Sequence, residues 1–391
     1  MPNIRNTIVF IVFVTLCYGA LLWNNRAHCL EDRQWGLKLL QDDDRNCYYL
    51  RAAWVIDKTI PYKDNFQEYP LLGAYFLALP RLINPTVCQY RIIFTGLMFI
   101  IFYVTIYLLS KISKIIDGDY KNIILVMFPS FLWFTANRFD LLPAALSLLS
   151  TYLLFRNKYN SAFFVLGLAI MTKWYPIIYA PLFLSYVYAN QSNKIEKRVV
   201  SFKALFFLLF VIGVICMHAI LLSGGKNFFV PYIWHWDRWA NADSLLSFLK
   251  LPYMTGQRVV IIKWIFFSLQ FVSLPLLLMR AIKSKKELIA SMAIATVSFI
   301  IFAKFNSPQW LLWVSPIMLL INARAVFVLL LLFDLSTFIY FPLGADLSYM
   351  WARNYLFFRA MVLLNIIIKF ILVFYLCNYL IKLRKIQPIL P

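Results

Sequence analysis

Long apolar runs recur from one end of the chain to the other, and they limit its fold more than any other feature. A helix needs about 20 apolar residues to cross a bilayer, and most of these runs have roughly 15 to 22. Charged residues make up 14% of the 391 residues, against about 25% in soluble domains. The sequence therefore predicts an all-α polytopic membrane protein. Linkers and repeats are absent, so we expect a single membrane domain over residues 1–391.

The apolar runs divide into about twelve predicted spans, which would place both termini on one side of the membrane. They lie near residues 7–23, 92–110, 122–136, 141–155, 160–173, 176–190, 201–222, 259–280, 288–303, 309–322, 325–342 and 357–381.

The basic residues indicate on which side of the membrane the termini lie. The termini and alternate loops on one face together carry 18 Lys and Arg but only four acids. By the positive-inside rule, that face is cytoplasmic and so are both termini. The membrane therefore accounts for the net charge of +21, and no nucleic-acid partner is needed. This would be a plasma membrane in a prokaryote or the endoplasmic reticulum in a eukaryote.

The opposite face collects most of the acids and the unusual polar motifs. They lie in two large outer loops, 24–91 and 223–258, and in short segments at 137–140, 173–176 and 304–310. Charges near the ends of spans are costly unless they face water or partners, so they indicate a site. The alternative is that they only anchor the chain, because Trp, Tyr, Lys and Arg also gather at the membrane interface.

The stretch from Asp42 to Leu72 is the most acidic part of the chain. Residues 45–57 predict an amphipathic helix on the membrane surface, with Asp44 at its start. Asp44 is then either a helix cap or a carboxylate able to accept a proton from a sugar hydroxyl, and both roles are compatible. The apolar segment 71–83 is short for a span. Counting it as one would place the basic loop 111–121 outside, so we interpret it as a re-entrant or surface helix.

Motifs on this outer face resemble those of polyprenol-phosphate-mannose-dependent mannosyltransferases of the GT-C superfamily (glycosyltransferase family 87-like). The first loop matches that family's spacing at Asp44, Tyr48, Ala52, Pro61, Tyr62, Asp64, Glu68, Tyr69 and Pro70. It departs from the pattern at Lys58, where the family tends to have Gly, and at Leu71, where it has Pro. Further matches are the segments Asn137–Pro143, Gly167–Pro176, His235–Ser244 and Ser307–Trp313.

The resemblance implies a GT-C-like bundle that transfers a hexose, mannose above all, from a polyprenyl- or dolichyl-phosphate sugar to a lipid or glycan acceptor. It implies an inverting displacement on the non-cytoplasmic face, with Asp44 as the base or Asp64 in its place. The implied substrate-binding residues are Glu68, Tyr62, Arg138, Asp140, Lys173, Tyr175, His235, Arg238, Lys304 and Gln309. Cations are needed to hold the departing lipid phosphate.

A lipid-linked donor requires no cofactor, and the chain has no nucleotide-binding motif. A divalent metal near Asp42, Asp43 and Asp44 is conceivable, but consecutive helical residues cannot all face one ion. The main alternative function is a twelve-span secondary transporter, for which Asp334 is the principal acid within a span. Transporters of this size usually contain internal repeats, and none is seen. The acceptor and the oligomeric state stay open.

Overall fold

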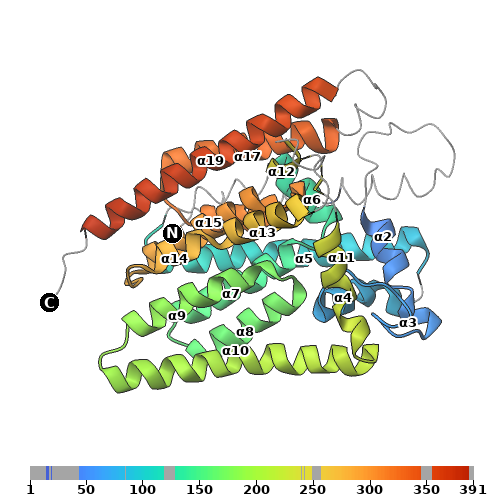
Figure 1. The fold of residues 1–391 in the computed structure, drawn as a ribbon, viewed down its shortest axis with the longest axis horizontal. Helices are drawn as coiled ribbons and strands as arrows, with labels where there is room; N and C mark the ends of the chain where they lie inside the picture. Colours follow the sequence, from blue (N-terminus) through green and yellow to red (C-terminus); the bar gives the residue numbers. More distant parts are fainter. Residues whose placement is uncertain are drawn as a thin grey trace.

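The fold consists of helices (Figure 1). The computed structural model describes residues 15, 16, 19, 44–83, 85–118, 128–238, 240, 241, 243–248, 257–344 and 355–386. Over these residues there is no β-strand, and one isolated bridge pairs Pro61 with Asn65. The predicted all-α class is confirmed for this part of the chain.

The described helices follow in chain order. Up to the middle of the chain they are α2 (Asp44–Arg51), α3 (Trp54–Asp57), α4 (Leu71–Ala78), η1 (Leu79–Ile83), α5 (Val87–Ile115), α6 (Pro129–Asn137), α7 (Leu141–Phe155), α8 (Tyr159–Thr172), η3 (Tyr175–Ile178), α9 (Tyr179–Ala189) and α10 (Lys194–Ser223). After it they are η4 (Lys226–Phe229), α11 (Val230–Asp237), α12 (Leu245–Phe248), α13 (Gln257–Phe271), α14 (Ser273–Leu278), α15 (Lys285–Phe302), η6 (Pro308–Trp310), α16 (Leu311–Met318), α17 (Arg324–Phe338), η7 (Ile339–Gly344) and α19 (Tyr355–Ile386).

Five helical segments of the described chain are long and apolar enough to cross a membrane. They are Val87–Ile115, Lys194–Ser223, Val260–Leu278, Arg324–Leu343 and Leu356–Lys385. A sixth candidate is the pair formed by α6 and α7, which is bent by 104° at a short break. The chain is thus a multi-pass membrane protein.

The predicted number of about twelve spans is not confirmed. Several expected spans fold as helices too short to cross alone: α7, with 15 residues, is about 22 Å long, whereas the hydrocarbon core is about 30 Å thick. The segments Tyr159–Thr172 and Tyr175–Ala189 are likewise shorter apolar helices, and so is Leu71–Ile83, which was not expected to cross. The expected span at residues 7–23 lies almost entirely outside the described residues.

Side-chain capping sets where three long helices begin. Thr86, Asn193 and Ser284 each accept a hydrogen bond from the main-chain N–H three residues later, at the starts of α5, α10 and α15. Such caps satisfy N–H groups that have no partner within the helix. At its other end α10 stops at Gly224, whose φ of 73° is in the left-handed region.

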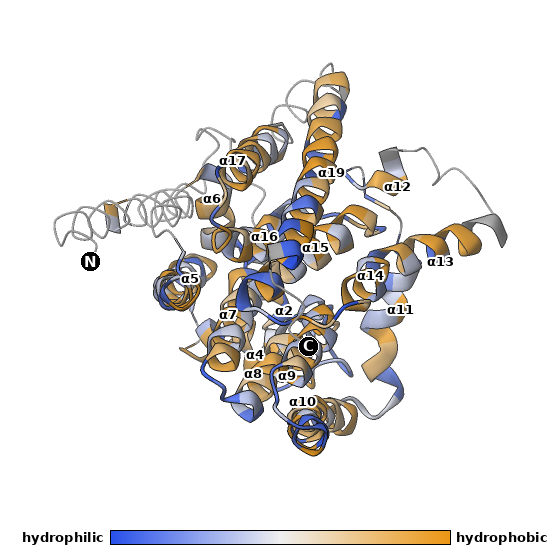
Figure 2. Ribbon diagram, turned by 90° about the vertical axis from the view of Figure 1, so that its left-hand side faces the viewer, coloured by the Kyte–Doolittle hydropathy of each residue, from blue (hydrophilic) through white to orange (hydrophobic). Residues whose placement is uncertain are grey.

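The helices form a buried centre and an apolar rim. In Figure 2, α10 and α13 lie at the edge, while α7, α15 and α16 lie near the middle. Only 17% of the best spanning window of α10 is buried, and α10 exposes Phe206, Phe210 and Leu221. Most side chains of α15 and all those of α16 are buried. Exposed apolar side chains around a packed centre are expected where lipid is the solvent.

The loops predicted to be cytoplasmic meet in the structure. The turn after α5 and the start of α15 line one small cavity together with Asn322 and Tyr379, and Asn190 donates a hydrogen bond to the main-chain oxygen of Lys283. In Figure 1 the outer ends of α9 and α14 lie at the left, away from α2, α4 and α11 at the right. Several of the basic loops predicted to be cytoplasmic therefore lie at one end of the bundle.

The break between α6 and α7 contains Arg138 and Asp140, and it lies near the end of α2 and α11. α6 is held by Asp334 of α17, whose carboxylate accepts hydrogen bonds from the main-chain N–H groups of Ser130 (3.1 Å) and Phe131 (2.9 Å). Ser130 Oγ in turn donates to the main-chain oxygen of Asp334, at 2.8 Å. The acid considered for a transport site thus serves as an N-terminal cap for a neighbouring helix.

The first loop follows its predicted plan with one interruption. The expected helix at 45–57 forms as α2 and α3, separated by a turn at Ala52 and Ala53, and α4 forms within 71–83. α3 ends at Lys58, whose φ of 52° lies in the left-handed region. Glycine adopts this conformation without the steric cost paid by other residues. The difference from the family pattern at Lys58 therefore falls on a position where glycine is favoured.

Candidate active site

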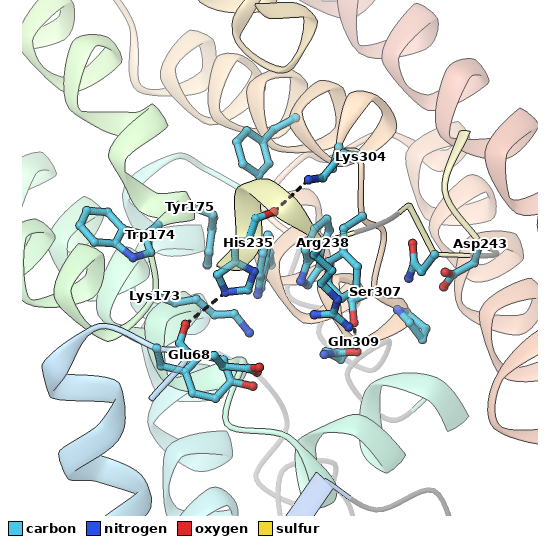
Figure 3. Close-up of a pocket in the computed structure, with 18 of the residues that line it drawn as sticks. Glu68, Lys173, Trp174, Tyr175, His235, Arg238, Asp243, Lys304, Ser307 and Gln309 are labelled. Atoms are coloured by element: carbon cyan, nitrogen blue, oxygen red, sulfur yellow. Dashed lines mark hydrogen bonds between the residues drawn. The ribbon is translucent and has the colours of Figure 1, made fainter. Parts of the chain in front are cut away.

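A cavity of about 980 Å³ opens at one end of the bundle, between the end of α2, the break between α6 and α7, the start of η3 and α11 (Figure 3). Its walls come from segments far apart in the sequence: the first loop, the α6–α7 break, the start of η3, α11, α13 and the segment between α15 and α16. The cavity is therefore formed by the tertiary fold and not by any single segment.

Most of the residues predicted to bind substrate line this cavity. They are Glu68, Arg138, Lys173, Tyr175, His235, Arg238, Lys304 and Gln309. Asp140 lies directly behind the wall through its contacts with Lys173 and Trp313. These segments thus line one cavity, and the role of their residues in binding substrate stays a prediction.

Lys173 and Asp140 form a buried ion pair. Lys173 Nζ lies 2.6 Å from Asp140 Oδ1, and the Asp140 residue is 0% exposed. The same oxygen accepts a hydrogen bond from Trp313 Nε1 at 2.8 Å. The ammonium also faces the rings of Tyr69, Phe139 and Trp313, at 4.9 to 5.4 Å from their centroids. Asp140 and these π faces offset much of its charge.

Stacked aromatic rings form the part of the wall beside Lys173. Tyr175 lies parallel to Trp313 with ring centroids 4.1 Å apart, and Trp313 stacks on Trp310 at 4.6 Å. Tyr175 follows Lys173 by two residues and both tryptophans belong to the η6–α16 segment, so the stack joins two distant parts of the chain. Flat apolar rings of this kind suit the face of a sugar.

The first loop contacts α11 through Glu68 and His235. Glu68 is paired with Arg51 at 2.8 Å, and its main-chain oxygen lies 3.2 Å from His235 Nε2. Burial opposes ionisation of Glu68, yet Arg51 outweighs it and lowers the pKa of the carboxyl. Burial, together with nearby Arg238 and Lys173, lowers the pKa of His235. A neutral His235 donates from Nε2 to that carbonyl.

Arg238 and Lys304 contact the C-terminal end of α11. The Arg238 guanidinium lies 3.7 Å above the Phe305 ring and 4.8 Å from the Trp234 ring. These contacts fix the plane of the guanidinium. Lys304 Nζ donates to the main-chain oxygens of His235 (2.9 Å) and Trp236 (2.6 Å), as a cation at a helix C-terminus should. Burial and the neighbouring Lys263 lower the pKa of Lys304 to about 8.

Arg138 and Gln309 complete the predicted set on the cavity wall. Arg138 is the residue directly after α6, and its guanidinium lies 5.9 Å from the centroid of the Trp133 ring. Gln309 Oε1 accepts a hydrogen bond from Ser307 Oγ at 2.5 Å. Both side chains are buried apart from their contact with the cavity.

Tyr62 and Asp64, two residues of the predicted site, do not line the cavity. Tyr62 is buried against Leu71 and Phe228, and its hydroxyl donates to the main-chain oxygen of Tyr69 at 2.5 Å. Asp64 is exposed, and its carboxylate accepts the main-chain N–H of Ile60 at 2.9 Å. Both shape the turn between α3 and α4. Asp44 begins α2, but its side chain is outside the described part of the structure, so its predicted role stays a prediction.

Four charged residues near the cavity were not predicted as site residues. Arg51, Lys263 and Asp243 line it, and Lys369 lies behind Asp243 through Asn306. Lys263 and Lys369 fall inside predicted spans, and charges within spans are functional candidates by default. That signal was available in the sequence. For Arg51, whose partner is Glu68, no such signal exists.

The cavity is electropositive. The described lining carries the cations Arg51, Arg138, Lys173, Arg238, Lys263 and Lys304, and the acids Glu68 and Asp243. The six cations outnumber the two acids, so the described lining has an excess of positive charge. Such a wall attracts an anionic group. Over the described residues no group of three His, Cys, Asp or Glu is arranged to hold a metal ion.

Comparison with known families gives the class of reaction. The family model Mannosyltransferase (PIG-M), a GT-C type family, matches residues 134–385, which is more than half of the chain. The chain belongs to this mannosyltransferase family. It is therefore a glycosyltransferase of the membrane, and the matched region carries most of the cavity wall, from Arg138 to Phe358. A search of curated proteins found no match.

Proposed function

We propose that this mannosyltransferase takes mannose from a polyprenyl or dolichyl phosphate and transfers it to a hydroxyl of a lipid or glycan acceptor. The observation that supports this most is the electropositive cavity at the end of the bundle away from the basic loops. The phosphate of such a lipid needs cations at the end of the bundle, so that the lipid tail can stay among the helices. Both termini are then cytoplasmic and the cavity faces the non-cytoplasmic side, in the plasma membrane or the endoplasmic reticulum.

Arg238 is the residue best placed to hold the phosphate. Its plane is fixed by Phe305 and Trp234, so little side-chain freedom is lost when an anion binds. Lys263 faces the same wall from α13. Lys173 is held by Asp140, which offsets much of its charge, so it serves as a fixed part of the wall. The stacked Tyr175, Trp313 and Trp310 offer a surface for the sugar ring.

The reaction that fits is a single inverting displacement. The acceptor oxygen forms a bond to the anomeric carbon while the bond from that carbon to the phosphate oxygen breaks. The polyprenyl phosphate leaves with the electron pair, and the acceptor proton passes to a carboxylate. We assign that base to Asp44. Asp64 is the weaker candidate, because its carboxylate is engaged with Ile60 away from the cavity.

The acid considered for the transporter alternative has a structural role. Asp334, the acid within a span, is occupied with the main-chain N–H groups of Ser130 and Phe131. A substrate or ion site would instead need ligand groups that face a passage near the bilayer midplane.

Transfer by the purified protein tests the proposal. Protein in nanodiscs, supplied with radiolabelled polyprenyl-phosphate mannose and a lipid extract as acceptor, should form a labelled product. Asp44→Asn should lower the rate by about 10²- to 10⁴-fold, the usual contribution of a general base. Asp57→Asn is the matched control, since Asp57 is an exposed acid of α3 in the same loop.

The outcomes separate the parts of the proposal. A wild-type protein that transfers no mannose from this donor would contradict the donor assignment. Full activity in Asp44→Asn, with loss in Asp64→Asn, would move the base to Asp64.

A further inference from the structure

A chain of buried polar side chains runs from α19 to the cavity wall. Lys369 lies in the middle of this apolar helix, is 4% exposed, and donates from Nζ to Asn306 Oδ1 at 3.3 Å. A lysine buried at this depth is costly, so its presence calls for a function. The Phe333 ring, 5.4 Å away, covers it on another side.

Asn306 ties this lysine to the segment that carries Asp243. The main-chain N–H of Asn306 donates to Asn241 Oδ1 at 2.8 Å, and its Nδ2 donates to the main-chain oxygen of Asp243 at 3.1 Å. Asn241 Nδ2 donates back to the main-chain oxygen of Asn306. The position of Asp243 is thus set by the 304–310 segment and, through it, by α19.

Asp243 presents a carboxylate to the cavity. It is 8% exposed, lines the wall, and lies in Figure 3 on the far side of Arg238 from Lys173 and Trp174. The charged or titratable groups facing it are Arg238, Lys369 and Tyr340, from the end of α11, α19 and η7. Burial raises the pKa of Asp243 to about 7, while Lys369 and Arg238 oppose that rise.

We propose that Asp243 binds hydroxyl groups of the sugar carried by the lipid phosphate, with Lys369 as the residue that positions it and keeps it ionised. This inference rests on the proposed function. A sugar linked to a phosphate held by Arg238 is one bond away from that phosphate, which places its hydroxyls near a neighbouring carboxylate. A carboxylate accepts hydrogen bonds from two adjacent hydroxyls, the pattern that a pyranose offers.

Binding of two lipids separates sugar recognition from phosphate recognition. The change in tryptophan fluorescence on adding polyprenyl-phosphate mannose or polyprenyl phosphate to protein in nanodiscs gives both affinities. Asp243→Asn should weaken binding of the mannosyl lipid by about tenfold or more, since a hydrogen bond to a charged group is lost. Its affinity for polyprenyl phosphate should change little. Asp57→Asn controls for the loss of an acid elsewhere.

The pH dependence of binding tests whether Lys369 acts on the carboxylate of Asp243 or only supports the fold. Binding of the mannosyl lipid by the wild type should weaken as the pH falls through about 7, because Asp243 takes up a proton. Lys369→Met removes a cation that lowers the pKa of Asp243, so the weakening should begin at higher pH. Lys369→Arg keeps the charge and should keep the wild-type profile.

Each outcome bears on one claim. Equal loss of affinity for both lipids in Asp243→Asn, or an unmoved pH profile in a folded Lys369→Met, would overturn this inference. Should Lys369→Met fail to fold, Asp243→Asn decides alone, because the amide has the same shape. A wild type that binds neither lipid would instead contradict the proposed function.

Discussion

At the scale of single residues, the Lys173–Asp140 pair should carry a large share of local stability. Lys173→Met leaves a carboxylate that is 0% exposed without its cation. Removing one partner of a buried pair typically costs about 3–5 kcal/mol in the free energy of unfolding. A thermal melt in detergent, followed by circular dichroism, should show a clearly lower midpoint and little transfer activity.

The double variant Asp140→Asn/Lys173→Met provides the control for that experiment. It removes both charges while leaving the side-chain shapes similar, so much of the lost stability should return. A single Lys173→Met variant as stable as the wild type would contradict the importance of the pair.

The sequence predicted in part which residues from distant segments of the chain come together. The topology placed Lys173, His235 and Arg238 on one face, and they line one cavity. The pairing of Lys173 with Asp140 was beyond prediction, because it depends on how the break after α6 meets the start of η3. Tyr62 and Asp64 match the family spacing, yet both serve the local turn, and spacing cannot separate the two roles.

At the scale of elements, the contact of α4 with the end of α8 positions Lys173. A Cβ on Gly73 of α4 would lie 2.6 Å from the main-chain oxygen of Thr172, the residue before Lys173. Gly73→Ala must therefore push the two elements apart. We expect a loss of about 1–3 kcal/mol, typical of overpacking, and a lower rate of mannose transfer. Thermal melts and the transfer assay measure the two effects.

Gly96→Ala is the matched control, because nothing lies within 4 Å of the added Cβ in α5. Alanine is the better helix former, so this variant should be as stable as the wild type or slightly more so. Equal behaviour of the two alanine variants would show that the α4–α8 contact is looser than described.

The helices and their order along the chain were predictable from the sequence, but which of them cross the membrane was not. Hydrophobic runs located most of the helices, including the one within 71–83. Run length could not show which helices cross the membrane, because short buried helices such as α7 and α8 are equally apolar. Nor could it show that Asp334 caps a neighbouring helix, since that contact joins residues 204 positions apart.

At the scale of the whole molecule, the gathering of basic loops at one end predicts the sidedness of the protein. Asp57→Cys should react with an impermeant maleimide in intact cells or sealed vesicles of outside-out orientation, and Arg198→Cys only after permeabilisation. Both positions are exposed. Cys47 is also exposed and free, so the experiment needs a Cys47→Ser background. Labelling of Arg198→Cys from the outside would reverse the assignment of the cavity to the non-cytoplasmic face.

The link from α19 to Asp243 also bears on how the enzyme is made. Ribosomes deliver helices to the membrane in chain order, so the first loop and α11 are in place well before α19 is synthesised. Until then Asp243 and Asn306 lack Lys369, the cation behind them. A nascent chain thus has an incomplete binding wall, and competence to bind the donor should arise only when the last described helix has been inserted.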